Sequence, residues 1–329
     1  YNKLKHICQS TPFILYLFPK KPSIKAMPHE NLPLELLNKH RESLDLKNPL
    51  IVENEDALFE TEKGQKESAI VFLPKSKALI TMTLSLVAHK VAKGGTVILV
   101  GTKKGGIESA KKIYEEIIGS VQKKIVGNHS ALYVGKNDKD TPPKKVEDFL
   151  TLFPVVYKDK TIQVAHLPGV FSAHELDPGT KILLDHLPLG SKTLLDLACG
   201  TGIVGAIYKT LSPETQIHFS DTSLLALEAT KKTLEKNNMS AQVTRSDVFS
   251  RIQGEFDLIA VNPPFHSGID TDYTFIDKLI KEASQHLTKK GKLYTVANSF
   301  LNYKDKLMTI GPTTEVYRDS QYALYCTEK

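Results

Sequence analysis

The sequence predicts an α/β protein that folds as two tandem domains, each built on a mostly parallel, doubly wound sheet. Its length of 329 residues exceeds what one hydrophobic core usually fills. In both halves short apolar runs alternate with longer amphipathic stretches, which is the pattern of strands joined by helices. The composition is 41% hydrophobic and 24% charged, which is typical of a globular protein and excludes a disordered or fibrous one.

Charge and cysteine content set broad limits on the function. The formal net charge of +6 favours a polyanionic partner such as RNA, but only modestly, because many unrelated enzymes share this balance. Cys8, Cys199 and Cys326 are too few and too scattered for a disulfide framework or a zinc site. We therefore expect a cytoplasmic protein without a metal. The apolar run at 12–18 is shorter than a membrane span, so we expect no membrane segment.

The first half contains one βαβ-like domain, predicted for residues 27–140. The chain opens with Tyr1 and its first methionine is Met27, so residues 1–26 are interpreted as an extension or a cloning product. The expected strands and helices of this domain are strands 68–73, 96–100 and 131–134 and helices 77–91 and 107–118. The polar, proline-containing stretch 135–147 has the composition of a linker, and the domain boundary is placed after residue 140.

The second domain is predicted for residues 141–329. Its first apolar segment is 153–164. The elements expected after it are strands 192–197, 216–220, 242–246, 256–261 and 292–297 and helices 181–187, 203–211, 223–237 and 274–287. Strands separated by helices predict a mostly parallel, Rossmann-like sheet.

The two halves resemble each other around one helix, turn and strand. The segment AHKVAKGGTVILVG at 88–101 matches SQHLTKKGKLYTVAN at 284–298 in the spacing of a helix end, a Lys-Gly turn and an apolar strand. The first half lacks the motifs described below. This indicates a duplicated fold whose N-terminal copy is degenerate, with a chance match as the alternative.

The strongest motif is LLDLACGTG at 194–202, which ends an apolar strand and opens a helix. Gly200 can adopt the positive φ of the turn, and Gly202 can let a ligand approach the backbone closely. With Gly205 the run reads G-x-G-x-x-G, and Asp221 ends the next predicted strand. Taken alone, this is a dinucleotide fingerprint.

An acid ahead of the glycines turns the prediction from NAD towards S-adenosylmethionine. Asp196 would face the site. A carboxylate there attracts the ammonium or sulfonium group of S-adenosylmethionine, but it does not attract the anionic pyrophosphate of a dinucleotide. Asp221 would accept hydrogen bonds from the ribose hydroxyls. Cys199 in the turn and Thr222 after Asp221 are counted among the cofactor contacts. The plain alternative is that Asp196 is a helix-capping or salt-bridged acid and Asp221 a simple cap.

The second motif is Asn262-Pro263-Pro264-Phe265, at the carboxyl end of a predicted strand. An amino group conjugated to a ring is a poor nucleophile. If the Asn262 side-chain oxygen and the Pro263 carbonyl accept its two hydrogens, its lone pair is directed at the methyl group. The prolines fix the backbone and Phe265 can stack on a planar substrate. The alternative is an ordinary Asn-Pro turn.

Three further residues are weaker candidates. Asp247 ends the intervening strand and is expected to bind the adenine amino group, with Val248 packing on the ring, although an exposed acid after a strand needs no function. His266 suggests a general base. We assign it a supporting or RNA-facing role, because a methylated amino cation can lose its proton to water.

These motifs resemble the bacterial ribosomal RNA small-subunit guanine-N2 methyltransferases of the C type. The resemblance spans 68–300 and also includes Pro168-Gly169-Val170-Phe171-Ser172 and Val296-Ala297-Asn298-Ser299-Phe300-Leu301. It implies two class I methyltransferase domains, of which the first assists folding or RNA recognition, S-adenosylmethionine as the cofactor, and ribosomal RNA or the small subunit as the partner. It places Phe171 near the cofactor and Asn262 to Phe265 around the target guanine. A monomer is expected.

Four other functions remain open at this point. A large-subunit guanine-N2 family shares the Asn-Pro-Pro-Phe-His motif, and protein glutamine N5-methyltransferases hold an amide nitrogen with a similar device. An NAD-dependent oxidoreductase would use Gly200 to Gly205 but leaves the Asn262 motif unexplained. A non-catalytic RNA-binding or assembly protein is the fourth.

Overall fold

The computed structural model describes residues 32–44, 46, 49–59, 66–171, 175–263 and 269–329. The chain divides into two compact units, residues 1–148 and 149–329. The boundary expected after residue 140 lies in the extended segment that precedes this division. Residues 1–26 lie outside the described part of the chain. No helix of the described residues is long and apolar enough to cross a membrane.

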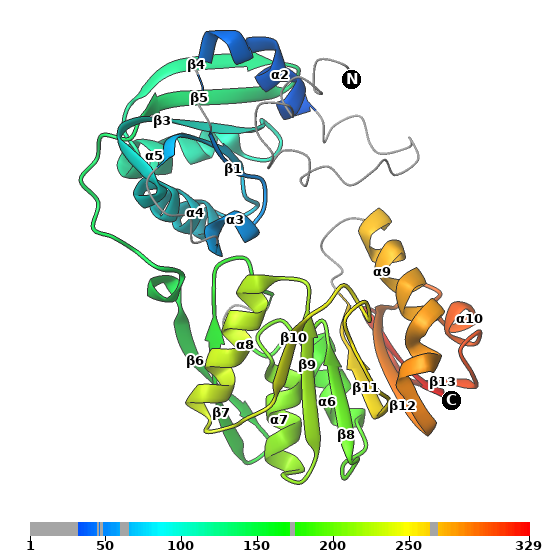
Figure 1. Ribbon diagram of the computed structural model, residues 1–329. Helices are drawn as coiled ribbons and strands as arrows, with labels where there is room; N and C mark the ends of the chain where they lie inside the picture. Colours follow the sequence, from blue (N-terminus) through cyan, green and yellow to red (C-terminus); the bar gives the residue numbers. More distant parts are fainter. Residues whose placement is uncertain (1–31, 45, 47–48, 60–65, 172–174, 264–268) are drawn as a thin grey trace. The chain divides into compact units, whose positions relative to one another are not determined.

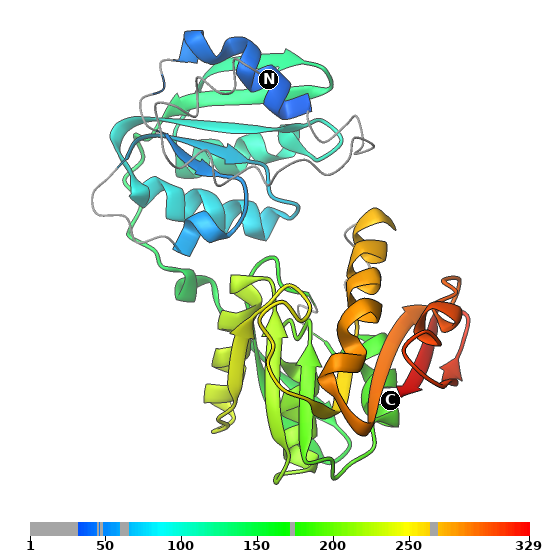
Figure 2. The same ribbon diagram turned by 45° about the vertical axis from the view of Figure 1, so that its right-hand side comes forward.

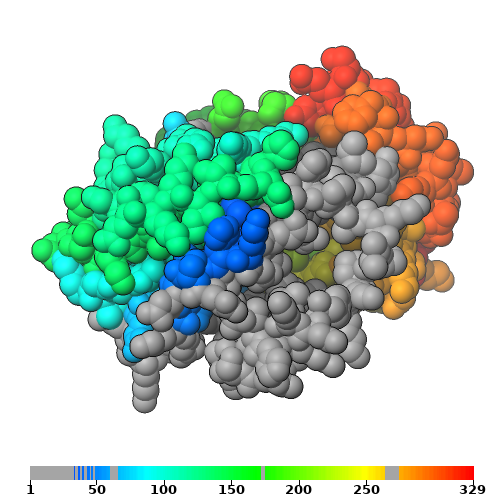
Figure 3. All heavy atoms as spheres, turned by 90° about the horizontal axis from the view of Figure 1, so that it is seen from above, coloured from blue at the N-terminus to red at the C-terminus, as the bar shows by residue number. Residues whose placement is uncertain are grey.

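The first unit has a five-stranded sheet in the order β1-β2-β3-β5-β4 (Figure 1). Its strands are β1 (Leu50–Val52), β2 (Lys66–Phe72), β3 (Val91–Thr102), β4 (Val121–Gly127) and β5 (Ser130–Lys136), and its helices are α2 (Leu32–His40), α3 (Asp56–Phe59), α4 (Lys77–Lys90), α5 (Ile107–Ile117) and the 3₁₀ turn η2 (Arg41–Leu44). β1, β2 and β3 are parallel, whereas β5 and β4 are antiparallel to their neighbours. Helix α2 packs against β5 and β3. Figure 3 shows blue atoms of the α2 region beside the blue-green atoms of the β4 and β5 region.

The second unit has a seven-stranded sheet in the order β10-β9-β8-β11-β12-β14-β13. The strands are β8 (Thr193–Leu197), β9 (Gln216–Asp221), β10 (Gln242–Arg245), β11 (Phe256–Val261), β12 (Leu287–Asn298), β13 (Thr313–Arg318) and β14 (Tyr322–Glu328). The helices are α6 (Pro178–His186), α7 (Ile203–Leu211), α8 (Leu224–Lys236), α9 (Ile269–Glu282), α10 (Lys304–Leu307) and the 3₁₀ turn η4 (Ala283–His286). A further 3₁₀ turn, η3 (Val146–Phe149), spans the division between the two units. The first five strands in this order are parallel, and β14 and β13 are antiparallel to their neighbours.

Both faces of this sheet are covered, because successive side chains of a strand point to opposite faces. Leu194 and Leu258 belong to the core shared with α7, whereas Leu195 and Ile259 belong to the core shared with α9. Figures 1 and 2 show α9 alongside β12 in both views. Asp196 follows Leu195, so its side chain is on the α7 face, and this alternation determines what the acid contacts.

A two-stranded antiparallel hairpin precedes the large sheet, formed by β6 (Thr151–Tyr157) and β7 (Lys160–His166). The sequence predicts one apolar segment here, but Lys158, with φ of 54°, lies in a turn that divides it into two strands. The hairpin is fixed to α8 by hydrogen bonds. The Gln163 N–H donates to Asn237 Oδ1 at 3.0 Å, and Asn237 Nδ2 donates to the Gln163 carbonyl at 2.7 Å.

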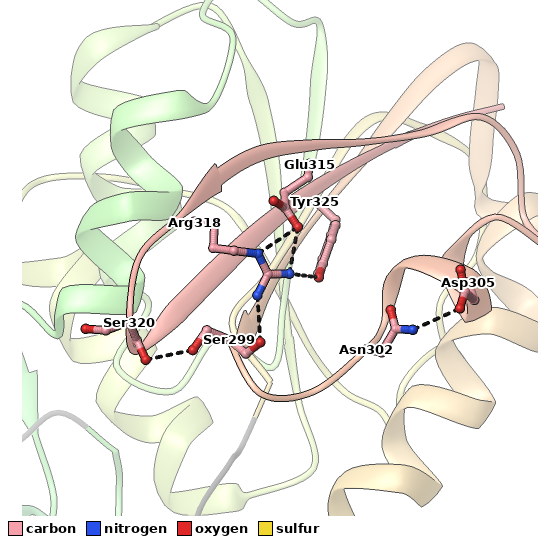
Figure 4. A network of polar contacts seen from close by, with 7 residues as sticks. All are labelled: Ser299, Asn302, Asp305, Glu315, Arg318, Ser320 and Tyr325. Carbon is pink, nitrogen blue, oxygen red and sulfur yellow. Dashed lines mark hydrogen bonds and ion pairs between the residues drawn. The ribbon is translucent and has the colours of Figure 1, made fainter.

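Four strands were not predicted: β1, β4, β13 and β14. The sequence pattern of β13 is weak because most of its side chains are exposed or half-buried, as in an edge strand. Arg318 holds it in place: its guanidinium donates to Glu315 Oε2 at 2.6 Å, to the Tyr325 hydroxyl at 2.8 Å and to the Ser299 carbonyl at 2.6 Å (Figure 4). The turn after β12 is thereby tied to the antiparallel edge. Helix α9 also begins earlier than the predicted start at residue 274.

The two units share one strand arrangement. In the first unit β1, β2 and β3 are parallel and are followed across the sheet by antiparallel β5 and β4; in the second unit β8, β11 and β12 are parallel and are followed by antiparallel β14 and β13. The predicted match of 88–101 with 284–298 therefore pairs β3 with β12. Strands equivalent to β9 and β10 are absent from the described part of the first unit, and with them the acid that ends β9, Asp221, and the acid that follows β10, Asp247.

Candidate active site

The predicted motifs meet at the carboxyl edge of the parallel strands. Leu197 at the end of β8 pairs with Ser220 in β9 and with Val261 at the end of β11. The residues that follow these positions are the glycine turn, Asp221 and Asn262. In doubly wound sheets this edge is where ligands bind.

The glycine turn uses backbone conformations that favour glycine. Gly200 and Gly202 have φ of 56° and 74°, and Ala198 also lies in this region with φ of 58°. A Cβ on Gly200 would have no heavy atom of the described residues within 4 Å apart from its chain neighbours, whereas a Cβ on Gly202 would lie 2.8 Å from Thr230 Cγ2. The space that a Cβ on Gly202 would fill is therefore occupied by Thr230 of α8, whereas the corresponding space at Gly200 is open. The contact of Gly202 with a cofactor stays a prediction.

Asp196 is buried beneath this turn. Its side chain is 3% exposed, and Oδ2 accepts a hydrogen bond from the Gly205 N–H at 2.9 Å in the first turn of α7. Burial, together with the nearby charge of Asp221, raises the pKa of Asp196 to about 7. Asp196 thus makes a helix-capping contact, which was the alternative interpretation of this residue. Its ionisable carboxyl group also lies beneath the carboxyl edge of the sheet.

Asp221 connects the glycine turn to the start of α8. Oδ2 accepts from the Gly200 N–H at 3.0 Å and Oδ1 from the Ser223 N–H at 2.9 Å. The side chain is half-buried, and burial raises the pKa of Asp221. Its neighbour Thr222 is exposed, and the Thr222 carbonyl accepts a hydrogen bond from Arg245 Nε at 3.0 Å.

Cys199 is packed under the turn. Its Sγ lies 3.4 Å from Thr230 Oγ1, and the Thr230 hydroxyl donates to the Gly200 carbonyl at 3.0 Å. Burial raises the pKa of the Cys199 thiol. The thiol is therefore a packed, neutral group, and the contact of Cys199 with a cofactor stays a prediction.

Asp247 and Val248 lie beyond β10. Asp247 is 54% exposed and forms an ion pair with Lys278. Val248 is buried with φ of 51°, and its carbonyl accepts from the Ser246 hydroxyl at 2.9 Å. The buried Ser246 hydroxyl therefore stabilises the turn at Val248, whereas the Asp247 carboxylate lies at the surface.

Asn262 follows β11, and its amide is oriented by hydrogen bonds. Nδ2 donates to Asp177 Oδ2 and to Thr180 Oγ1, each at 3.0 Å. Oδ1 is buried and has no hydrogen-bond partner among the described residues. Pro263 is also buried. The other residues predicted for this motif lie outside the described part of the chain: Pro264, Phe265 and His266.

Sequence reasoning did not identify Asp177 and Thr180. Asp177 caps α6: Oδ2 accepts from the Thr180 N–H at 2.8 Å, and Pro178 is the first helical residue. The sequence Asp-Pro-Gly-Thr carries the signature of a helix start. Nothing in it relates this helix to Asn262, which is far away along the chain.

The segment before α6 forms a tight turn. The Val170 N–H donates to the Leu167 carbonyl at 3.1 Å, with φ of 93° at Gly169, and His166 Nε2 lies 2.9 Å from the Val170 carbonyl. Phe171 is 45% exposed at the end of this turn. Ser172 lies outside the described residues.

Fold and site together define a class I, S-adenosylmethionine-dependent methyltransferase. The family model described as "Methyltransferase small domain" matches residues 161–326, and "Methyltransferase small domain N-terminal" matches residues 35–153. The chain belongs to the ribosomal RNA small subunit methyltransferase C family, with whose members it aligns over most of its length.

Two relatives and one solved structure illustrate the match. The family member of Aliivibrio fischeri is 32% identical over 82% of this chain and 79% of its own, and that of Pseudomonas entomophila is 40% identical over 72% and 71%. The Thermus thermophilus 16S rRNA N2 G1207 methyltransferase, solved with AdoMet and guanosine, has a TM-score of 0.72 at 24% identity, covering 83% of this chain and 75% of that one. This structure supports the fold of both units.

Proposed function

We propose that this chain transfers the methyl group of S-adenosylmethionine to the exocyclic N2 of a guanine in small-subunit ribosomal RNA. The observation that carries the proposal is Asn262 Oδ1, which is buried and without a partner among the described residues. A buried acceptor left unpaired costs free energy, so its retention is best explained by a donor that arrives with the substrate.

The residues at the carboxyl edge fit the cofactor. S-adenosylmethionine, when bound, supplies a methyl group activated by a sulfonium. The open side of Gly200 leaves room beside the turn, Asp221 offers carboxylate oxygens to ribose hydroxyls, and the Asp196 carboxyl provides a negative charge for the cofactor's cation. Asp247 and Val248 are assigned to the adenine and Phe171 to the rim of the site.

Asn262 and Pro263 act on the acceptor nitrogen. Asn262 Oδ1 and the Pro263 carbonyl accept the two hydrogens of the amino group, which draws its lone pair out of conjugation and directs it to the methyl group. Methyl transfer to this nitrogen would break the methyl–sulfur bond of the cofactor and leave a cation on the nitrogen, which would lose its proton to water. Phe265 is assigned to stack on the extruded base, which offsets part of the cost of unstacking.

The choice of guanine depends on the relatives. Adenine N6 and cytosine N4 would satisfy the same two acceptors, but the relatives are named for the small ribosomal subunit, and the solved neighbour is described with guanosine. The large-subunit and glutamine alternatives lack comparable support. We assign the enzyme to the cytoplasm, where its substrate is located.

The first unit is proposed to be inert in catalysis and to serve RNA recognition or stability. Leu73-Pro74-Lys75 follows β2 where the equivalent strand β11 is followed by Asn262. Hence the first unit has no residue in this position that can hold an amino group in the same way.

The proposed function is tested with unmethylated small-subunit RNA and labelled cofactor. Asn262→Ala should lower kcat by roughly 10²-fold or more, because one positioning bond is worth about 3 kcal/mol in the transition state. Mass spectrometry of the digested product should identify N2-methylguanosine. N6-methyladenosine, a methylated cytidine or label in protein alone would overturn the assignment.

A further inference from the structure

The amide of Asn262 has two possible orientations, and only one of them can serve the proposed reaction. An asparagine amide is nearly symmetric in shape, but one end donates two hydrogen bonds and the other accepts them. In the structure both Nδ2 hydrogens are directed to partners, Asp177 Oδ2 and Thr180 Oγ1, each at 3.0 Å. The accepting end, Oδ1, is therefore the one left for the substrate.

Asp177 is the partner that determines this orientation. An ionised carboxylate only accepts hydrogen bonds, so it pairs with Nδ2 and repels Oδ1. The Thr180 hydroxyl both donates and accepts, so by itself it would tolerate either orientation. If the Asn262 amide were flipped by 180°, Oδ1 would face the Asp177 carboxylate. Nδ2, which can only donate, would then face the amino group of the substrate, which also donates.

Helix α6 holds Asp177 in position. Oδ2 of Asp177 also caps this helix by accepting from the Thr180 N–H at 2.8 Å, and Pro178 fixes the start of the helix. Thr180 is 4% exposed, and α6 packs against β12 and β14. One carboxylate oxygen thus serves both the helix cap and the Asn262 amide, so the orientation is built into the scaffold.

We propose that Asp177 is a positioning residue that, supported by Thr180, fixes Asn262 as a hydrogen-bond acceptor and so makes the site selective for an amino group. This inference depends on the proposed role of Asn262. The orientation of the amide would affect the choice of substrate as well as the rate. A base edge that presents a carbonyl or an unprotonated ring nitrogen has no hydrogen to donate. Such an edge leaves Asn262 Oδ1 and the Pro263 carbonyl without a hydrogen bond. A site built to hydrogen-bond a substrate group strongly rejects an analogue that lacks this group, because polar groups of the site are then buried without a partner.

Asp177→Ser separates positioning from helix capping. Serine is an effective cap, and this chain uses it twice: Ser223 Oγ accepts from the Ala226 N–H at 3.1 Å and Ser76 Oγ from the Leu79 N–H at 3.2 Å. The shorter side chain withdraws the carboxylate from Asn262. We expect kcat to fall about tenfold or more while the KM for S-adenosylmethionine and the melting temperature change little. Ser76→Ala, which removes a cap in the first unit, is the matched control and should leave kcat unchanged.

A reciprocal exchange gives a stricter test. Asn262→Asp alone brings two carboxylates together and should abolish most activity. Combined with Asp177→Asn, the new amide can donate to the carboxylate at 262 and still cap α6 through its oxygen, leaving one oxygen at 262 for the substrate. The double variant should therefore be at least about tenfold more active than Asn262→Asp alone. If each substitution only damaged the structure independently, the double variant would be less active than either single variant, so a gain shows that the two residues are coupled.

The outcomes distinguish this inference from the proposed function. If Asn262→Ala loses activity while Asp177→Ser keeps the wild-type kcat, or if the double variant is no better than Asn262→Asp, Asp177 does not position the amide and the proposed function stands. If Asn262→Ala retains full activity, the proposed role of Asn262 itself is overturned.

Discussion

The carboxylate of Asp196 accepts a hydrogen bond from the N–H of Gly205 at 2.9 Å, so a buried acid closes the first turn of α7 beneath the glycine turn. Because the group is buried close to Asp221, the pKa of Asp196 is raised to about 7. An acid with this pKa changes its charge within the range where the enzyme would be assayed. We therefore expect the protonation state of Asp196 to link pH to both cofactor affinity and stability.

Affinity for S-adenosylmethionine should rise with pH through about 7, because only the ionised Asp196 attracts the cofactor's cation and the pKa of Asp196 is near 7. Asp196→Asn should remove this pH dependence and weaken binding roughly tenfold at pH 8, a loss of about 1.4 kcal/mol. Isothermal titration calorimetry across this range measures both. An equal pH dependence in the variant would assign the titration to another group.

The same variant has a defined effect on stability. Since the folded-state pKa of Asp196 lies above its unfolded value, this group favours folding fully below about pH 4, and that contribution is lost as the pH rises through about 7. The free energy of unfolding of Asp196→Asn relative to wild type should therefore increase from pH 4 to pH 8. Urea melts at several pH values measure the difference, and a difference that decreases towards pH 8 would contradict the raised pKa.

Gly202→Ala should mainly lower the stability of the protein, whereas Gly200→Ala should mainly weaken cofactor binding. At Gly202 the new Cβ would lie 2.8 Å from Thr230 Cγ2, in addition to the cost of φ at 74°. We expect a loss of stability of about 2 kcal/mol or more, partly restored by Thr230→Ser, which removes that methyl group. At Gly200 only the backbone strain of about 1 kcal/mol applies, but the new methyl group enters the open side and should weaken cofactor binding.

Thermal melts with and without S-adenosylmethionine separate the two variants. Gly200→Ala should lose most of the stabilisation that the cofactor gives, because binding to the native state alone raises its stability. If Gly200→Ala keeps wild-type affinity, the cofactor does not lie on the open side of this turn.

Asp221→Ala should reduce S-adenosylmethionine affinity by about tenfold or more, because it removes both the expected ribose contact and the hydrogen bond that holds Gly200 at 3.0 Å. Binding should retain one site per chain in the wild type, since the first unit lacks an equivalent acid in its described part. Asp159→Ala, in the exposed hairpin turn, is the matched control. Calorimetry that finds two sites, or no change in Asp221→Ala, would contradict the assignment.

A truncated chain that begins at Lys145 tests the first unit. The second unit keeps the whole carboxyl edge and both of its core clusters, so S-adenosylmethionine binding should survive. Methylation of ribosomal substrate should fall, through a higher KM for RNA or a lower melting temperature. A truncated chain that is as stable and as active as the full chain would show that the first unit contributes neither.

Much of the fold was readable from the sequence because its signals are local. The alternation of strands and helices, the LLDLACGTG turn and the Asn262-Pro263 motif depend on neighbouring residues and on backbone conformations that glycine and proline restrict. The match of 88–101 with 284–298 likewise indicated the duplication, and the structure supplies its full extent in the shared strand order. The exposed edge strand β13 has no such pattern, so it was not predicted.

What only the tertiary structure decided is how residues distant in the sequence meet. The space that a Cβ on Gly202 would fill is occupied by Thr230 of α8, whereas Gly200 has the open side. Asp177 contacts Asn262 because the start of α6 reaches the end of β11, and that contact leaves Oδ1 as an acceptor with no partner among the residues that the structure describes. The sequence therefore indicated the chemical groups of the glycine turn and of the Asn262 motif, but not Asp177 or Thr180. The orientation of these groups depended on packing between elements, because a hydrogen-bond direction is fixed only when both partners are held in space.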